Sequence, residues 1–271
     1  MLAAGLLPAM PGGAAAAGAV DNLIAVCSDP KTPPHDAFQA CKKVAEQGRL
    51  DARRQALAWL NAGIAAYGLK LYDQAAQAQS KAIEADPGLA AAFENRALAY
   101  AKLGQVDKAL SDYAAALGLD PKSARAYLGR GNLRLSLDQP EQALADFDRS
   151  VQLAPDLSAA HYNRGVALMQ LGRPAEAEKA FSSVIGMDPR DAGAWLSRGQ
   201  ARAAQDQQDA LNDFGRAIDL RPEWGEAWYA RGRYLDKQDK TEAANSDLLR
   251  AWRLGYSDPW LIERVRKISG K

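Results

Sequence analysis

The sequence is poor in the residues that most enzyme and metal sites need. Its 271 residues include two cysteines and two histidines, too few for most metal-ligand sets or thiol-based active sites. It also lacks an excess of either charge, because 34 lysines and arginines face 33 aspartates and glutamates. Nucleic acids and anionic membrane surfaces attract basic proteins, so both are disfavoured as partners. The 48% of apolar and 25% of charged residues are typical of a folded, water-soluble protein.

Residues 1–20 contain no charged side chain. Prolines and glycines at positions 8–13 interrupt the apolar run, and a membrane-spanning helix needs about 20 apolar residues without such breaks. The small residues Ala17, Gly18 and Ala19 are typical of a signal-peptidase site. We therefore predict that residues 1–19 are a signal peptide and that the protein is exported, to a periplasm-like compartment.

Other interpretations of this leader stay open. No lysine or arginine precedes its apolar part, as a signal peptide normally requires. A misassigned start codon would explain that, and a flexible leader on a cytoplasmic protein is the other alternative. Residues 23–26 before Cys27 faintly resemble a lipoprotein box, but bulky Val26 stands where a small residue is expected.

A period of 34 residues runs through most of the chain. It is marked by prolines at Pro87, Pro121, Pro155, Pro189 and Pro222. A ring slot recurs with it, at Trp59, Phe93, Tyr127, His161, Trp195 and Trp228. Four residues further on is a small slot, at Gly63, Ala97, Gly131, Gly165, Gly199 and Gly232, where two helix backbones can approach closely. A second small slot holds an alanine in every unit, from Ala75 in the first to Ala244 in the sixth. The apolar slot after it holds Tyr113, Phe147, Phe181, Phe214 and Leu248, with Gln79 as the exception.

Each period contains two runs with helical spacing, separated by glycine or proline and ended by a proline turn. The combination resembles the tetratricopeptide repeat, over about residues 56–256, in six units that start near Ala56, Ala90, Ala124, Ser158, Ala192 and Gly225. The resemblance implies an all-α fold, a right-handed superhelical solenoid of helix-turn-helix repeats. The fifth unit has one residue fewer around 205–209, and the sixth has Tyr256 in place of the proline.

Both ends of this solenoid need a cap, because a bare terminal repeat would expose an apolar face. Residues 257–271 predict a C-terminal capping helix, with an apolar stripe that begins at Trp260. Residues 20–55 predict an N-terminal helical cap of two short helices, and in the register of a repeat Cys41 faces Cys27. We expect a disulfide between them, closing a loop of about 14 residues and worth about 3 kcal/mol. Two separate buried thiols are the alternative.

Arginines recur just before the small slot, at Arg96, Arg130, Arg164, Arg198 and Arg231. Aspartates follow 15 or 16 residues later, at Asp112, Asp146, Asp213 and Asp247. We predict intra-repeat ion pairs, although the arginines could also form a basic row that binds an acidic ligand. The fourth unit has Ala180 at the aspartate position, so Arg164 becomes the arginine to test for ligand binding.

In proteins that this sequence resembles, the first helix of every repeat lines an inner groove that holds a peptide or a partner helix. The corresponding groove residues here are Leu60, Ile64, Leu98, Leu128, Asn132, Tyr162, Val166, Met169, Leu196 and Tyr229. Exposed apolar and aromatic residues suggest a protein-binding surface, although some of these could only pack against neighbouring repeats. A clamp for a C-terminal carboxylate, known in one variant of the family, is disfavoured because Leu128 and Leu196 replace its basic residues.

The residues thus predict a non-catalytic adaptor or scaffold that binds a protein or peptide partner, without metal or cofactor. His161 fills a ring slot and His35 has no nucleophile or carboxylate constellation, so neither supports catalysis. A self-assembling structural subunit, or an accessory subunit of an exported enzyme or envelope complex, are the alternatives.

Overall fold

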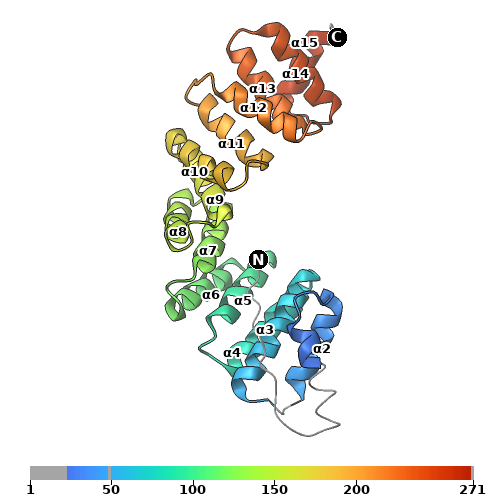
Figure 1. The fold of residues 1–271 in the computed structure, drawn as a ribbon, viewed down its shortest axis with the longest axis vertical. Helices are drawn as coiled ribbons and strands as arrows, with labels where there is room; N and C mark the ends of the chain where they lie inside the picture. Colours follow the sequence, from blue (N-terminus) through green and yellow to red (C-terminus); the bar gives the residue numbers. More distant parts are fainter. Residues whose placement is uncertain (1–22, 48–49, 270–271) are drawn as a thin grey trace. The chain divides into compact units, whose positions relative to one another are not determined.

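The computed structural model describes residues 23–47 and 50–269, so the predicted signal peptide lies outside the described residues. These residues form helices and turns, with no strand among them (Figure 1). Their contacts divide the chain into two compact units, residues 1–133 and 134–271. Each unit contains hydrophobic clusters of its own.

Unit 1 is a row of helices in which each packs against the next. Residues 23–28 are helical and are followed by α2 (Pro34–Glu46), α3 (Ala52–Gly68), α4 (Tyr72–Ala85), α5 (Ala90–Lys102) and α6 (Val106–Leu119). Helix α7 (Ala124–Ser136) contains the boundary between the units. The first helices α3 and α5 also touch each other directly, as a stack of hairpins requires.

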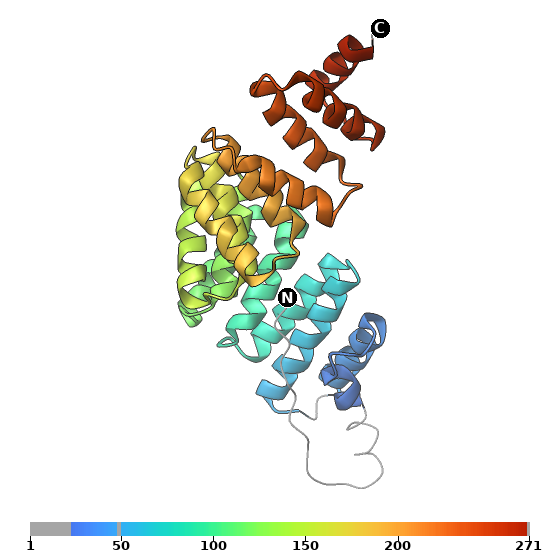
Figure 2. The ribbon, with the colours of Figure 1, turned by 45° about the horizontal axis from the view of Figure 1, so that its top comes forward.

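Unit 2 continues the same alternation to the end of the chain (Figure 2). Its helices are α8 (Pro140–Leu153), α9 (Ser158–Gln170), α10 (Pro174–Met187), α11 (Ala192–Ala203), α12 (Ala210–Leu220), α13 (Gly225–Lys237), α14 (Thr241–Arg253) and α15 (Pro259–Ser269). Helix α11 contacts both α9 and α13, so these three first helices form a continuous row within the unit. From α5 onward, every first helix begins at the residue where the sequence places the start of a repeat.

The turn inside each hairpin has one left-handed residue at a regular position. Its members are Lys70, Gly104, Asp138, Gly172, Asp206 and Asp239, with φ between 56° and 71°. The following N–H bonds back to a carbonyl five residues earlier, as from Gln105 to Tyr100, which ends the first helix in a Schellman motif. The residue missing from the fifth repeat therefore falls after Asp206, and α12 has 11 residues where α10 has 14.

The small slot is small because an aromatic or apolar side chain of the second helix presses against it. A Cβ atom added at Gly165 would lie 2.6 Å from the Phe181 ring, and one at Gly199 would lie 2.7 Å from the Phe214 ring. These distances are too short for carbon atoms, so a side chain there would force the hairpin apart. The close helix approach expected from the sequence is confirmed at these positions.

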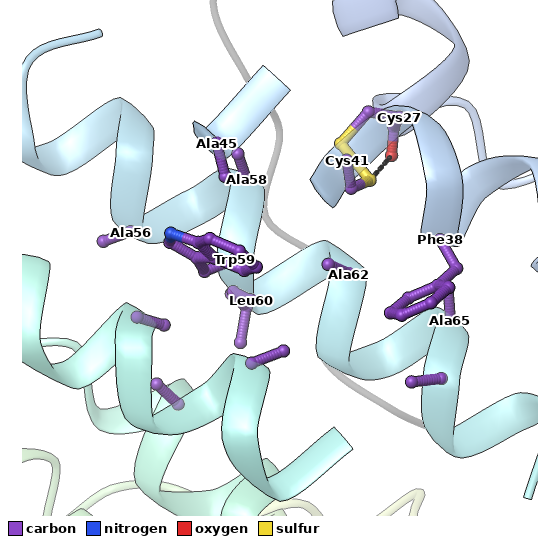
Figure 3. Close-up of a cluster of buried hydrophobic side chains, with 14 of the residues drawn as sticks. Cys27, Phe38, Cys41, Ala45, Ala56, Ala58, Trp59, Leu60, Ala62 and Ala65 are labelled. Carbon is purple, nitrogen blue, oxygen red and sulfur yellow. Dashed lines mark hydrogen bonds between the residues drawn. A yellow bond between two sulfur atoms is a disulfide. The ribbon is translucent and has the colours of Figure 1, made fainter. Parts of the chain in front are cut away.

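The N-terminal cap consists of the helix at residues 23–28 and α2, which packs on α3. Figure 3 shows Phe38 of α2 against Ala65 of α3, and Ala45 facing Ala58. The buried sulfur atoms of Cys27 and Cys41 lie at disulfide-bonding distance, 2.16 Å, with their Cα atoms 4.8 Å apart. The cap is thus joined to the first repeat through a small apolar core.

The C-terminal cap is α15. The Asp258 side chain caps its first turn by accepting a hydrogen bond from the Leu261 N–H, at 2.8 Å. Leu261 and Val265 are buried and pack in one cluster with Leu248 of α14. The apolar stripe of the predicted capping helix therefore covers the last repeat, as end caps of repeat proteins do.

Candidate functional site

Two of the predicted groove residues are core residues instead. Leu60 is 2% exposed and Leu196 is 3% exposed. Leu196 packs in a cluster with Ala210 and Phe214 of the second helix, and Leu60 belongs to the core of unit 1 (Figure 3). The prediction that they line an open groove is wrong, because both side chains are packed in the core. The same position in other repeats holds Tyr162 and Tyr229, which stay partly exposed.

The side chains of the other predicted groove residues are at least partly exposed to solvent. In unit 1, Ile64, Leu98 and Leu128 are half-buried and Asn132 is exposed. In unit 2, Tyr162, Val166, Met169 and Tyr229 are half-buried. Tyr162 also has a structural role, since its hydroxyl lies 3.1 Å from Ser197 Oγ and its ring meets Phe181 edge-on. Asn132 and the nearby Asn163 both have interactions within the chain.

A pocket of about 550 Å³ lies on the first helices of the last two repeats, within unit 2. Small side chains line it, namely Ala203 at the end of α11, Ala204 directly after it, and Ala230 of α13. Aromatic side chains line it too: Phe214, Tyr229, Tyr234, Tyr256 and Trp260. Its polar lining includes Gln200, Glu226, Arg233, Asp236 and Lys237. An apolar concavity with a few charged groups is the usual character of a ligand-binding site.

The cap contributes one aromatic wall of this pocket. Tyr229 of α13 stacks on Tyr256 with ring centroids 4.6 Å apart, and it meets Trp260 of α15 edge-on at 6.1 Å. Arg233 lies between these rings, with its guanidinium carbon 4.1 Å from the Trp260 centroid. Its Nη1 donates a hydrogen bond to the Tyr229 hydroxyl, at 2.9 Å. The stacked guanidinium is therefore held in place before any partner binds.

Asp258 completes the electrostatics of this wall. Burial, then a hydrogen bond to the Asp258 carboxylate, raises the pKa of Tyr229. Burial of Asp258 itself works to raise its pKa, but hydrogen bonds from Tyr229 and from the N–H groups of Leu261 and Trp260 outweigh it and lower that pKa below its ordinary value. The Tyr229 hydroxyl thus accepts a hydrogen bond from Arg233 and donates one to Asp258, which fixes its orientation.

The arginine row joins the two helices of a repeat. Arg96 pairs with Asp112 through two hydrogen bonds of 2.7 and 2.9 Å. Arg198 pairs with Asp213 through bonds of 2.9 and 2.8 Å. The same pairing joins Arg231 to Asp247, at 2.7 and 3.0 Å. These aspartates are buried, and the pairs are those that the sequence predicts.

In the third repeat, as in the fifth, an arginine one turn further along the first helix binds the buried aspartate. Arg130 lies over the Tyr127 ring, with its guanidinium carbon 5.6 Å from the ring centroid. Asp146, which is buried, accepts a hydrogen bond from Arg134 at 2.8 Å. Arg202 binds Asp213 in the same way in the fifth repeat, at 3.0 Å.

The sequence gives Arg164 no aspartate in its own repeat and makes it the arginine to test for ligand binding. Its partner lies elsewhere, since Arg164 Nε donates to Asp148 Oδ1 at 2.6 Å. Asp148 lies on α8, in the preceding repeat, 16 residues earlier. Hydroxyl groups occupy the same position in two other repeats, where Ser80 accepts from Arg96 and Ser182 from Arg198, at 3.0 and 3.2 Å. Arg96, Arg164 and Arg198 therefore also join their repeats to the ones before them.

The ring slot has a second structural use. The ring N–H of Trp195 donates to the Pro189 carbonyl at 2.9 Å, and that of Trp228 donates to the Pro222 carbonyl at 2.8 Å. His161 Nε2 lies 2.9 Å from the Pro155 carbonyl. His161 is thus a structural residue that fixes the inter-repeat turn, in the role that tryptophan has elsewhere. His35 is exposed, and its Nδ1 lies 3.5 Å from the Asp36 carboxylate.

Two general observations apply to the described residues. No group of three or more His, Cys, Asp or Glu side chains in them could hold a metal ion. None of the helices in this part of the chain is both long and apolar enough to cross a membrane.

Helix hairpins at a 34-residue period, joined by repeated contacts and covered by caps, define an α-helical repeat solenoid. The chain belongs to the tetratricopeptide repeat family, whose model matches residues 40–90, 95–158 and 162–209, more than half of the chain. Proteins of this family are generally protein-interaction scaffolds without catalytic activity of their own.

Solved structures of other proteins share this fold. YrrB, described as a tetratricopeptide repeat protein with an unusual peptide-binding site, is 25% identical, with a TM-score of 0.62 over 71% of this chain and 99% of that one. The protein pilF of Pseudomonas aeruginosa is 20% identical, with a TM-score of 0.68 over 82% of this chain and 99% of that one. MamA is 23% identical, with a TM-score of 0.55 over 59% of this chain and 95% of that one. The chain matches no curated protein sequence.

Proposed function

We propose that this protein is a non-catalytic adaptor that binds a segment of a partner protein on the first helices of its repeats. The observation that carries the proposal is the pocket on α11 and α13, with the aromatic wall that α15 adds. A cap that only covered the last repeat would need a polar outer face, whereas Trp260 lines the pocket.

The surface that leads to this pocket supports the same function. Tyr162, Val166 and Met169 on α9 are half-buried and lie on the helix that α11 contacts directly. Tyrosine, methionine and arginine are enriched in protein interfaces. YrrB, which shares the fold, has a peptide-binding site in the words of its description. The anchors proposed here are Tyr162, Val166 and Tyr229, and Leu196 is not among them.

Site-specific crosslinking tests this placement. A photoreactive residue replaces exposed Gln200 in the pocket, and in the matched control it replaces exposed Lys179 on the second helix α10. We expect the Gln200 position to capture one heterologous protein in the native host and the Lys179 position not to capture it. Equal capture from both positions would contradict a pocket-centred site. Capture of this chain alone would favour the self-assembling subunit.

We also infer that the protein works in an oxidising compartment and forms the Cys27–Cys41 disulfide there. The support is the distance of 4.8 Å between their Cα atoms, within the range of natural disulfides, together with the rarity of such bonds in reducing compartments. Intact mass spectrometry of protein from the native host is the test. A mass that lacks the leader and two hydrogens is expected. Full-length protein with two alkylatable thiols would overturn both inferences.

A further inference from the structure

We propose that the pocket of unit 2 recognises an extended partner segment in which one aspartate or glutamate lies next to an aromatic residue. Arg233 binds the carboxylate. The alanine floor of the pocket, formed by Ala203, Ala204 and Ala230 beside the aromatic wall, receives the ring. This inference rests on the proposed function and adds the chemistry of the partner to it.

Arg233 is unusual in its register. The position five residues after the ring slot lies on the open side of each first helix, and its occupants are Ile64, Leu98, Asn132, Val166, Gln200 and Arg233. Five of the six are uncharged. A charge at this position is therefore not required by the repeat, and its presence in the last repeat coincides with the pocket that Arg233 lines.

The guanidinium of Arg233 offers the edge that binds carboxylates elsewhere in this molecule. Arg96 and Arg198 each bind an aspartate through Nε and Nη2, with distances from 2.7 to 2.9 Å. Arg233 uses Nη1 for Tyr229, and within the described residues its Nε and Nη2 atoms have no hydrogen-bond partner. A bidentate pair with a carboxylate of a partner is the geometry that this edge favours.

Most of the other charges around the pocket are already paired. Lys237 forms an ion pair with Asp206, and Asp236 pairs with Arg264 at 2.6 Å. Asp258 accepts from Tyr229 and from the start of α15, and its carboxylate also interacts with the charge of Arg233. Glu226 also lines the pocket. The pKa of Tyr256 is raised by burial first, and then by the negative charges of Asp258 and Glu226. Glu226 repels a second carboxylate, so the site favours a single acidic residue over an acidic run.

Space for an aromatic ring comes from small side chains. Ala203 and Ala204 line the pocket at the C-terminal end of α11, at the positions where the preceding repeat has Met169 and Gln170. Ala230 adds a third small residue from α13. Between this floor and the ring of Trp260, an aromatic side chain finds edge and face contacts.

Fluorescence anisotropy with the full chain tests the proposal. The probes are labelled, end-capped peptides of sequence Gly-Ser-Phe-Asp-Ser-Gly and Gly-Ser-Phe-Asn-Ser-Gly. The variants are Arg233→Gln and the control Arg221→Gln. Arg221 is exposed, stacks on Trp224 at 4.7 Å and does not line the pocket, so its loss makes the same change in net charge.

We expect the aspartate peptide to bind at least about tenfold more tightly than the asparagine peptide, the size of one charged hydrogen bond. Arg233→Gln should abolish this preference and Arg221→Gln should keep it. Equal binding of the two peptides, or a preference that survives Arg233→Gln, would overturn the proposal. Failure of both peptides would overturn it too. In these cases a partner crosslinked from Gln200 would show that the adaptor function stands with another ligand chemistry.

Discussion

The connection between repeats through an arginine and a hydroxyl predicts a stabilising substitution. Arg96 and Arg198 each reach a serine 16 residues earlier, but Arg231 meets Gly215 at that position. A Cβ atom added at Gly215 would be 3.9 Å from Arg231 Nη1, with no closer neighbour outside its own helix. A serine Oγ there would come within about 3 Å of Nη1, which is hydrogen-bonding distance. Gly215→Ser should therefore supply the missing bond between α12 and α13.

The magnitude has two parts. Removing a glycine from a helix interior contributes about 0.5–1 kcal/mol with alanine and roughly 0.5 kcal/mol with serine, which has the lower helix propensity. A hydrogen bond to a charged group contributes about 1.5–3 kcal/mol when buried. The Arg231 side chain is 26% exposed, so about 1 kcal/mol is the reasonable share here. Gly215→Ser should then gain about 1.5 kcal/mol, and Gly215→Ala no more than about 1 kcal/mol.

Urea unfolding monitored by circular dichroism measures these differences, and hydrogen exchange of the α12–α14 amides assigns them to unit 2. The informative comparison is the stability of Gly215→Ser against that of Gly215→Ala, because helix propensity alone favours alanine. In an Arg231→Lys background, which keeps the charge but removes Nη1, alanine should become the more stabilising residue. Alanine equal to or better than serine in the native background would refute the inter-repeat bond.

Two further predictions concern stability. Burial raises the pKa of Glu94 above its ordinary 4.5, so the folded chain binds this proton more tightly than the unfolded chain. Its stabilising contribution is present below about pH 4.5 and is lost as pH rises through the raised pKa. The urea midpoint of the native protein should fall relative to Glu94→Gln over that range, and parallel pH curves would contradict this. Leu196→Ala should cost about 2–5 kcal/mol as a core truncation, whereas Gln200→Ala, one turn later, should change stability by less than about 0.5 kcal/mol. Similar urea midpoints for these two variants would contradict the assignment of Leu196 to the core.

The periodic part of the molecule is predictable because each slot has one geometric cause. Glycine at the small slot and phenylalanine at the apolar slot meet across a hairpin, so the spacing of Gly165 and Phe181 alone indicates their contact. Opposite charges in register, such as Arg198 and Asp213, likewise predict an ion pair. The contact of Arg164 does not follow from this register, because its partner Asp148 belongs to the previous repeat.

The open surface is harder to predict. The positions one and five residues after the ring slot lie one turn apart on the same side of a helix, and periodicity does not say which of them faces solvent. In the fifth repeat the first position holds buried Leu196 and the second holds exposed Gln200. Part of the aromatic wall lies outside the repeats, since Trp260 belongs to the cap. The one signal for it is Tyr256, which departs from proline and stacks on Tyr229.

The shortened fifth repeat shows how a local loss is compensated at a distance. The sequence indicates only a shorter surface connection, but Glu178 of α10 binds this turn from the preceding repeat. Its carboxylate accepts from Arg202 at 2.9 Å, from Gln205 at 3.2 Å and from Gln207 at 3.3 Å. From the following repeat, the Tyr234 hydroxyl donates to the Gln207 carbonyl at 2.9 Å. Because Tyr234 also lines the pocket, the turn that lost a residue helps to hold one of the aromatic side chains of the proposed binding site.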